Sequence, residues 1–400
     1  MLLGMIKAAL GLSVIILLAG AVLGSFGLLL FPSDILNYLP SFSLEVWQRP
    51  HNSLLADPVF QFEPWRHYAK EQILSGRIPL WNDLNGGGVP FLANPQTAVF
   101  YPLNFLYYIF PLQIALNIIP LLKLFLMALF TYLYLVSLRI SKGAAFLGSF
   151  LSAFAGFPIM WLLWPHTNVF ILFPLLLYLT EKLRGTKCSH RILVAICITY
   201  FIGVLGGHPE TLFHIGLLHF VYSFFRLSKK LFFHQLLLII LGFLLAGFLL
   251  LPFLEYLLSS SLIANRFQVN PGYYLPLKGI IYNFFPLMLG GPHLAYYKQL
   301  SEGVNFQELS GGFVGTVVIL ITVFGSIRFW SMPMVRFICL LLVVLLGIVY
   351  KIWPFFLFTQ LPFINAVANH RFIGFIGFFV TILFAIVIDR ISGKLFSRST

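Results

Sequence analysis

The sequence predicts an all-α polytopic membrane protein with about ten transmembrane helices. Sixty per cent of the 400 residues are hydrophobic and only 9% are charged, whereas soluble domains carry roughly 25% charged residues. Several apolar runs reach the roughly 20 residues that a membrane-spanning helix needs. These runs are continuously apolar and do not alternate with polar residues, which favours helices over a membrane β-barrel.

Ten apolar segments are expected to cross the bilayer. They are 5–31, 112–138, 143–163, 168–183, 191–206, 211–225, 232–256, 311–328, 335–352 and 372–390. The first is too long for the apolar core of a signal peptide, so we expect a retained helix. The segment 353–371 is apolar but contains two prolines, and it is expected to be re-entrant or to lie at the membrane interface.

The basic residues are distributed unevenly between the two sides of this arrangement. With a cytoplasmic N-terminus, the cytoplasmic segments hold 15 of the 25 Lys and Arg residues and only two of the 12 acids, Glu181 and Asp389. This is the positive-inside pattern of a cytoplasmic-membrane protein. The net charge of +13 therefore reports topology and does not indicate nucleic-acid binding. Most acids and histidines fall outside, so we expect any chemistry to be extracytoplasmic.

A single transmembrane domain, 1–400, is expected to carry two large outer loops, 32–111 and 257–310. The first loop contains the stretch "DPVFQFEPWRHY" (57–68). Asp57 and Glu63 each precede a proline, a pattern that starts helices. Two short helices are therefore expected, the second ending near residue 75.

The second of these helices is expected to be amphipathic. Trp65, Ala69 and Ile73 recur at spacings of four on one face, while Arg66 and Lys70 lie on another. This pattern is typical of a helix lying on a membrane surface. The carboxylates of the stretch have two interpretations that do not exclude each other: each can cap a helix, and each can act as a general base in an outer cavity.

The rest of the first loop, 78–104, is rich in Gly, Pro and Asn but holds aromatic anchors such as Trp81. Asn82, Asn94 and Gln96 are neutral hydrogen-bonding residues. Such side chains either contact sugar hydroxyls or hold the loop backbone, and the pattern leaves both open.

Four stretches together carry a resemblance to a known family. They are "LLADPVFQFEPWRHY", "GRIPLWNDLNGGGVPFLANPQTAVFYPLN", "WLLWPH" and "GGHPET", within residues 50–215, with a weaker continuation in "INAVANHRFIGF" (364–375). In these stretches the chain resembles the YfhO-like bacterial membrane proteins, which are grouped with glycosyltransferases of the GT-C fold. Asp83 stands where we would expect proline, and the chain stops at Thr400, where many members continue. We therefore expect either a short member or a fragment.

The resemblance implies a GT-C-like fold and a bacterial inner-membrane enzyme with its active face outside the cytoplasm. Such enzymes take a sugar from a polyprenyl-phosphate carrier, and a carboxylate in the first outer loop is their usual catalytic residue. The matching acid is Asp57, with Glu63 close behind. The implied partners are the lipid-linked donor, membrane lipid and a cell-envelope glycan or lipid acceptor. Lipoteichoic acid or polysaccharide glycosylation would fit.

Further polar residues are candidates for substrate binding. His208 and Glu210 lie in "GGHPE", and Arg371 follows His370 before the last span, where a guanidinium can bind a lipid phosphate. The full set of expected substrate-binding residues is Arg66, His67, Trp81, Asn82, Asn94, Gln96, His166, His208, Glu210, His370 and Arg371. The non-functional alternatives are turn structure for His208 and lipid-headgroup contact for Arg371.

We expect inverting sugar transfer with Asp57 as the base and with Arg371 and His208 stabilising the departing phosphate. No cofactor is required by the motifs. A divalent metal held by Asp57, His208 and His370 is an option without motif support. The alternatives are a flippase or transporter for a lipid-linked sugar, which predicts charged residues within the spans, and a non-catalytic glycolipid-binding assembly subunit.

Overall fold

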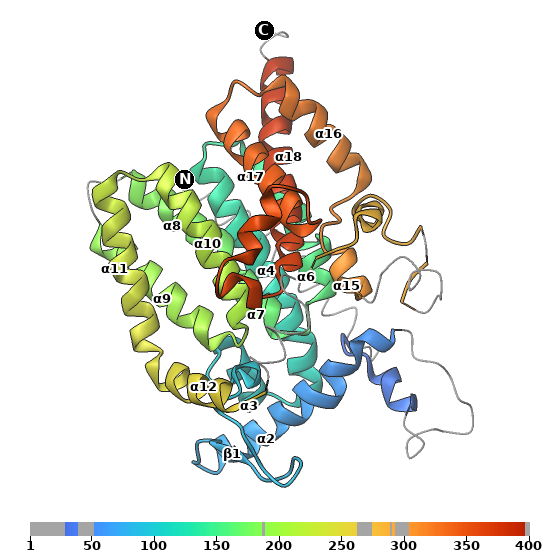
Figure 1. The fold of residues 1–400 in the computed structure, drawn as a ribbon, viewed down its shortest axis with the longest axis vertical. Helices are drawn as coiled ribbons and strands as arrows, with labels where there is room; N and C mark the ends of the chain where they lie inside the picture. Colours follow the sequence, from blue (N-terminus) through green and yellow to red (C-terminus); the bar gives the residue numbers. More distant parts are fainter. Residues whose placement is uncertain are drawn as a thin grey trace. The chain divides into compact units, whose positions relative to one another are not determined.

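The computed structural model describes residues 29–38, 52–185, 189–261, 274–288, 290–292 and 304–396. Regular structure in these ranges is helical apart from one antiparallel pair of two-residue strands, β1 (Trp81–Asn82) and β2 (Val89–Pro90). Figure 1 shows the helices along the chain. The all-α prediction is therefore confirmed for the part of the chain that the structure describes.

Three described helical segments are long and apolar enough to cross a membrane: Leu112–Ser137, Lys142–Met160 and Asn369–Gly393. A fourth is possible if the bent pair Lys229–Leu245 and Gly247–Ser259, which meet at 72°, forms one span. These helices support the prediction of a membrane protein. Helices found at several other expected spans, such as His190–Leu205, are apolar but shorter. The expected first span, 5–31, lies almost wholly outside the described residues.

The chain divides into two compact units, and one of the points at which it passes from one unit to the other falls within α4 (Leu112–Ser137). Unit 1 comprises residues 1–12, 124–161 and 263–400. Its further helices are α5 (Lys142–Ala153), α6 (Gly156–Met160), α15 (Phe306–Leu309), α16 (Thr316–Arg328), α17 (Pro333–Val349) and α18 (Phe372–Phe396), with 3-10 turns η6 (Leu277–Asn283), η7 (Phe355–Gln360), η8 (Ile364–Ala366) and η9 (Asn369–Arg371).

Helix α18 forms the centre of unit 1, where α5, α16 and α17 pack against it. Small residues allow this close approach, as is usual between membrane helices. A Cβ atom added to Gly148 of α5 would lie 2.6 Å from the Cβ of Ala385, and one on Gly325 of α16 would lie 2.2 Å from Cγ1 of Val387. The expected interfacial segment 353–371 forms the short turns η7 to η9 before α18.

Unit 2 comprises residues 13–123 and 162–262. Its helices are α2 (Glu63–Leu74), α3 (Phe105–Ile109), α7 (Pro165–Phe170), α8 (Leu172–Arg184), α9 (His190–Leu205), α10 (Pro209–Arg226), α11 (Lys229–Leu245) and α12 (Gly247–Ser259). Five short turns complete it: η1 (Ser33–Tyr38), η2 (Ser53–Leu55), the π-helical η3 (Pro58–Phe62), η4 (Pro95–Thr97) and η5 (Pro102–Asn104).

The expectation of two separately capped helices at Asp57 and Glu63 is wrong. Both residues have helical backbone angles, and the Asp57 side chain makes no capping hydrogen bond. A π-turn joins the two parts, with the Glu63 N–H donating to the Pro58 carbonyl five residues back. Proline at position 64 removes one donor from the regular ladder, and the helix continues through this stretch by a π-turn, a rare feature that occurs mostly as a single turn within α-helices.

The apolar face of α2 faces protein, so the expectation that this face lies on a membrane is also wrong. Ala69 is fully buried, and Trp65 and Ile73 pack with it against a cluster that includes Phe91 and Tyr107. Residues of the loop 91–108 therefore cover the apolar face of α2. The helix ends as expected at Gly76, which has a φ of +72° and forms a Schellman-type end.

Candidate functional site

Three ionisable side chains of unit 2 contact one short turn, residues 162–164, which we call the Trp164 turn. The buried indole Nε1 of Trp164 donates to Asp57 Oδ2 at 3.3 Å. Arg66 Nη2 donates to the Leu163 carbonyl at 3.3 Å, and the buried Lys123 Nζ donates to the Leu162 carbonyl at 2.9 Å. The Asp57 residue itself is exposed. The buried Trp164 indole therefore orients one carboxylate oxygen of Asp57, while the Asp57 residue remains exposed to solvent.

Glu63 lies one helical turn from Arg66 on α2 and has a different environment from Asp57. Its Oε2 is 3.9 Å from Arg66 Nη1, and its side chain is only 15% exposed. Burial raises the pKa of Glu63 to about 7, against the lowering effect of the nearby Arg66 and His67 charges. The Arg66 guanidinium also lies 4.7 Å from the centre of the Tyr107 ring, a cation–π contact that fixes its position. The two acids thus differ in exposure and in their polar contacts.

The loop amides predicted to contact sugar hold the loop backbone in this structure. Asn82 Oδ1 accepts from the Leu84 N–H at 3.0 Å, and Asn94 Oδ1 accepts from the Gln96 N–H at 3.1 Å. These Asx turns match the loop-holding alternative. Each side-chain oxygen has a second acceptor position and each side chain has an amide nitrogen, so contact with a sugar remains a prediction. Trp81 is exposed.

Two histidines of unit 2 stack at the start of α10. The rings of His166 and His208 have centroids 3.6 Å apart at an interplanar angle of 29°. His208 Nδ1 accepts from the Thr211 N–H at 3.1 Å, so the imidazole caps α10. Gly207 before it has a φ of +86°, and an added Cβ would lie 2.5 Å from the Pro95 carbonyl oxygen. The expected turn role of His208 is therefore present, and Glu210 follows in the first turn of α10.

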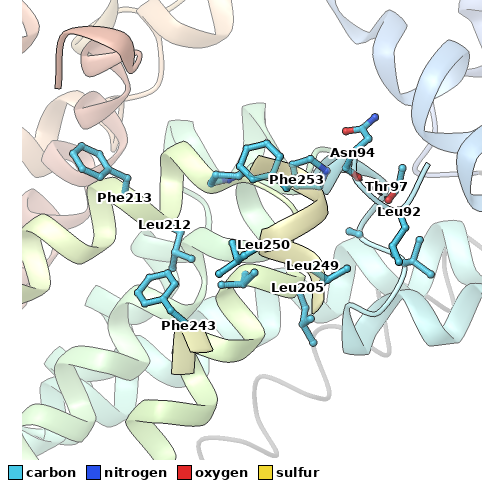
Figure 2. Close-up of a pocket in the computed structure, with 15 residues that line it drawn as sticks. Leu92, Asn94, Thr97, Leu205, Leu212, Phe213, Phe243, Leu249, Leu250 and Phe253 are labelled. Atoms are coloured by element: carbon cyan, nitrogen blue, oxygen red, sulfur yellow. Dashed lines mark hydrogen bonds between the residues drawn. The ribbon is translucent and has the colours of Figure 1, made fainter. Parts of the chain in front are cut away.

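An apolar pocket of about 190 Å³ lies beside this turn (Figure 2). Its walls come from α9, α10, the α11–α12 bend and the loop 92–99, and Figure 2 shows mostly leucine and phenylalanine side chains with Asn94 and Thr97 at the loop side. Pro95 and Ala98 contribute both to the pocket and to the contact with Gly207. The histidine pair and the pocket are thus joined by the same loop segment.

Unit 1 contains a buried ionic cluster that the sequence analysis did not predict. Glu308 of α15 accepts from His370 Nε2 at 2.8 Å and from Arg371 Nη2 at 3.4 Å. The Arg371 guanidinium lies 5.5 Å from the centre of the Trp161 ring. Burial raises the pKa of Glu308, but His370 and Arg371 lower it more, to about 2. Glu308 is thus the shared partner of two residues that were predicted to bind substrate.

The predicted site residues therefore fall into separate groups. Asp57, Glu63 and Arg66 gather near the Trp164 turn, His166 stacks on His208, and His370 pairs with Arg371 through Glu308 in the other unit. His67 pairs with Glu71 at 3.2 Å on the exposed side of α2. Among the described residues, no group of three His, Cys, Asp or Glu side chains is arranged to hold a metal ion.

The signals that could have revealed the missed partners were weak. Glu308 stands just before the expected span 311–328, and Trp164 follows an expected span. Both contacts join residues far apart in the chain. Comparisons with protein-family models, with curated proteins and with solved structures find no match to this chain.

Proposed function

We propose that this protein is a membrane glycosyltransferase that transfers a sugar from a polyprenyl-phosphate-linked donor to an extracytoplasmic cell-envelope acceptor. In this proposal the acceptor hydroxyl attacks C1 of the sugar and Asp57 takes its proton. The bond from C1 to the phosphate oxygen breaks, and the lipid phosphate leaves as an anion. Attack opposite the leaving group inverts the configuration at C1. The resemblance of the first outer loop suggested this reaction, and the surroundings of Asp57 support it.

The supporting observation is the hydrogen bond from Trp164 to Asp57. A general base needs a defined orientation and access to the hydroxyl that it deprotonates. Trp164 Nε1 holds Oδ2 at 3.3 Å, while the residue is exposed. Because this hydrogen bond fixes the carboxylate through Oδ2, the other oxygen has a defined orientation from which it can accept a proton from the substrate. A capping carboxylate would instead have bound the helix backbone, and Asp57 does not.

A cation at the same turn is suited to the departing phosphate. Arg66 contacts Leu163, next to Trp164, and is held over Tyr107. Guanidinium groups bind phosphate through paired N–H donors, and a fixed charge stabilises the anion that develops in the transition state. The contributions expected of His208 and Arg371 remain predictions, and Arg371 belongs to the other unit.

The apolar pocket beside the His208 turn is suited to part of the donor's lipid chain. Its lining is almost entirely aliphatic and aromatic, and apolar pockets of this kind bind hydrocarbon without requiring polar partners. Its volume of about 190 Å³ accommodates only a segment of a polyprenyl chain. The rest of such a chain would lie in the bilayer.

The test replaces Asp57 by Asn, which keeps an oxygen that can accept from Trp164 but cannot take a proton at neutral pH. Transfer of labelled sugar from a polyprenyl-phosphate donor is measured in membranes. We expect a loss of about 100-fold or more in the transfer rate, the range typical of a general base. Glu71→Gln is the matched control, because Glu71 is an exposed acid of the same loop. Full transfer by normally folded Asp57→Asn protein would overturn the assignment.

A glycolipid-binding subunit without catalytic activity is the second candidate, and the pocket favours it. This alternative predicts that the Asp57→Asn protein retains its cellular role while a pocket substitution such as Leu250→Trp abolishes it. The transporter alternative has less support. Lys123 lies within the candidate span α4, but its Nζ donates to the Leu162 and Trp164 carbonyls, so it holds the backbone of the Trp164 turn.

A further inference from the structure

The first outer loop exposes an apolar surface around the strands β1 and β2. We call residues 78–90 the hairpin. Large apolar side chains on the hairpin and at the adjoining end of α2 are between 54% and 78% exposed. They are Leu74, Ile78, Leu80, Trp81 and Leu84. Isolated exposed apolar residues are common on proteins, but these five large ones lie within residues 74–84, and such a concentration indicates an interaction surface.

The hairpin is an ordered structure with an inner and an outer side. Trp81 pairs with Pro90 and Asn82 with Val89; the Trp81 side chain is exposed and the Asn82 side chain is buried. At its base, the Tyr68 hydroxyl donates to the Trp81 carbonyl at 2.5 Å, and the Phe91 N–H donates to the Leu80 carbonyl at 2.9 Å. The buried Phe91 ring packs edge-on against Tyr68 at 5.0 Å. The hairpin is thereby fixed to α2.

The glycine run at the hairpin turn gives Trp81 its outward position. Gly86, Gly87 and Gly88 all have positive φ angles, from +56° to +110°, which side-chain-bearing residues rarely adopt. A Cβ on Gly88 would lie 2.4 Å from Trp81 Nε1, so the indole lies directly on the glycine backbone. Of the three glycines, Gly88 is the one that lies against Trp81, since a Cβ added to Gly86 or Gly87 would meet no atom within 4 Å.

The attachment of α2 places the hairpin near the end of a candidate span. Lys70 Nζ donates to the Phe110 carbonyl at 3.0 Å, and α4, a candidate membrane span, begins two residues later at Leu112. Ile109, Phe110 and Leu112 are also exposed. Apolar surface therefore occurs both on the hairpin and at the start of a span. Tyr68 and Phe91, which hold the base of the hairpin, belong to the same packed cluster as Ala115 and Leu116 of α4.

From these observations we infer that the hairpin is a lipid-contacting anchor that inserts Leu80, Trp81 and Leu84 into the interfacial region of the bilayer. Tryptophan beside aliphatic side chains is characteristic of this zone, because its ring combines an apolar body with an N–H donor. Arg77, at the base of the hairpin, can reach lipid headgroups. The anchor does not depend on glycosyl transfer. It would hold the first loop, and with it Asp57, at a fixed depth.

The anchor is tested with an environment-sensitive fluorophore on Leu84→Cys. The native cysteines are first replaced (Cys188→Ser, Cys197→Ala, Cys339→Ala), and the purified full chain is reconstituted in phosphatidylethanolamine–phosphatidylglycerol vesicles. Quenching by lipids with nitroxides near the headgroup is compared with quenching by aqueous iodide. We expect severalfold stronger lipid quenching at Leu84 than at Glu71→Cys, the control on the exposed polar side of α2. Iodide should show the reverse order.

Equal iodide quenching at the two positions, with no lipid quenching at Leu84, would overturn the inference. A hairpin that instead binds a soluble protein or a glycan would give that result, because neither is present in these vesicles. Hydroxyl-radical footprinting of the unmodified protein in the same vesicles covers the case in which the cysteine variants fail to fold. There we expect Trp81 to be protected and the exposed His67 to be oxidised, and rapid oxidation of Trp81 would contradict the anchor.

Discussion

A hydrogen bond from Trp164 orients the side chain of Asp57. Sequence alone could select this residue, since 12 acids in 400 residues make each one conspicuous and the motif resemblance points to it. Its partner could not be selected, because Trp164 lies 107 positions away and only the folding of the loop onto the turn brings them together. The same limit applies to Glu308, which is 62 positions from His370 by number and meets it only in the packed unit.

Glu63 should make the stability of the protein depend on pH. Burial raises its pKa from 4.5 to about 7, so the folded state binds a proton more tightly than the unfolded state does. The contribution of Glu63 is therefore most favourable below pH 4.5 and is lost as the pH rises through about 7. One pKa unit corresponds to about 1.4 kcal/mol, so raising the pKa by about 2.5 involves at most about 3.5 kcal/mol.

The measurement compares thermal unfolding of wild-type protein and Glu63→Gln in detergent between pH 5 and 8. Relative to Glu63→Gln, which cannot titrate, the wild-type melting temperature should fall as the pH rises. Glu71→Gln serves as a control on α2, and it should follow the wild-type profile. Parallel curves for wild type and Glu63→Gln would show that Glu63 keeps an ordinary pKa.

At the scale of elements, the turn between α9 and α10 depends on a glycine that no other residue replaces easily. Gly207 combines a φ of +86° with an added-Cβ distance of 2.5 Å to the Pro95 carbonyl oxygen. Gly207→Ala should lower stability by roughly 1 to 3 kcal/mol through backbone strain, with a further cost from displacing the loop 95–98. That displacement would also disturb the pocket.

Gly216→Ala is the matched control for this substitution. Gly216 lies within α10, and an added Cβ meets no atom within 4 Å, so alanine should be neutral or stabilise by about 0.5 to 1 kcal/mol. Thermal unfolding in detergent measures both variants. If Gly207→Ala were as stable as Gly216→Ala, the close contact between the turn and Pro95 would not exist in the protein.

Hydropathy predicted where many helices lie but could not predict where they bend. The expected span 232–256 is continuously apolar, yet the structure separates α11 from α12 at Ala246 with a 72° bend. An apolar run indicates only that a segment avoids water, and it carries no information about where the helix axis changes direction. Pro252 lies inside α12 and is six residues beyond the bend, so it does not mark the break. In the first loop, two prolines predicted two helix starts, and a π-turn joined them instead.

At the scale of the whole molecule, the ends of the helices in unit 2 differ in chemistry. Glu181 near the end of α8 binds Arg226 at the end of α10 through two bonds, including Oε2 to Nη2 at 2.7 Å, and it also accepts from Tyr222 and Arg184. These residues and the start of α11 lie at the end expected to face the cytoplasm. Glu181, one of the two acids assigned to that side, thus acts as a counter-ion within a basic surface.

This arrangement makes the membrane orientation testable. The positive-inside distribution predicts that Lys230, at the start of α11, faces the cytoplasm and that Glu71 of the first loop faces outward. In a background without native cysteines, a membrane-impermeant maleimide should label Glu71→Cys in intact cells. Lys230→Cys should be labelled only after the cells are permeabilised. Both residues are exposed in the structure, so a failure to react would reflect sidedness and not burial. Labelling of Lys230→Cys in intact cells would reverse the orientation of unit 2 and move Asp57 to the cytoplasmic side, where an acceptor in the cell envelope could not reach it.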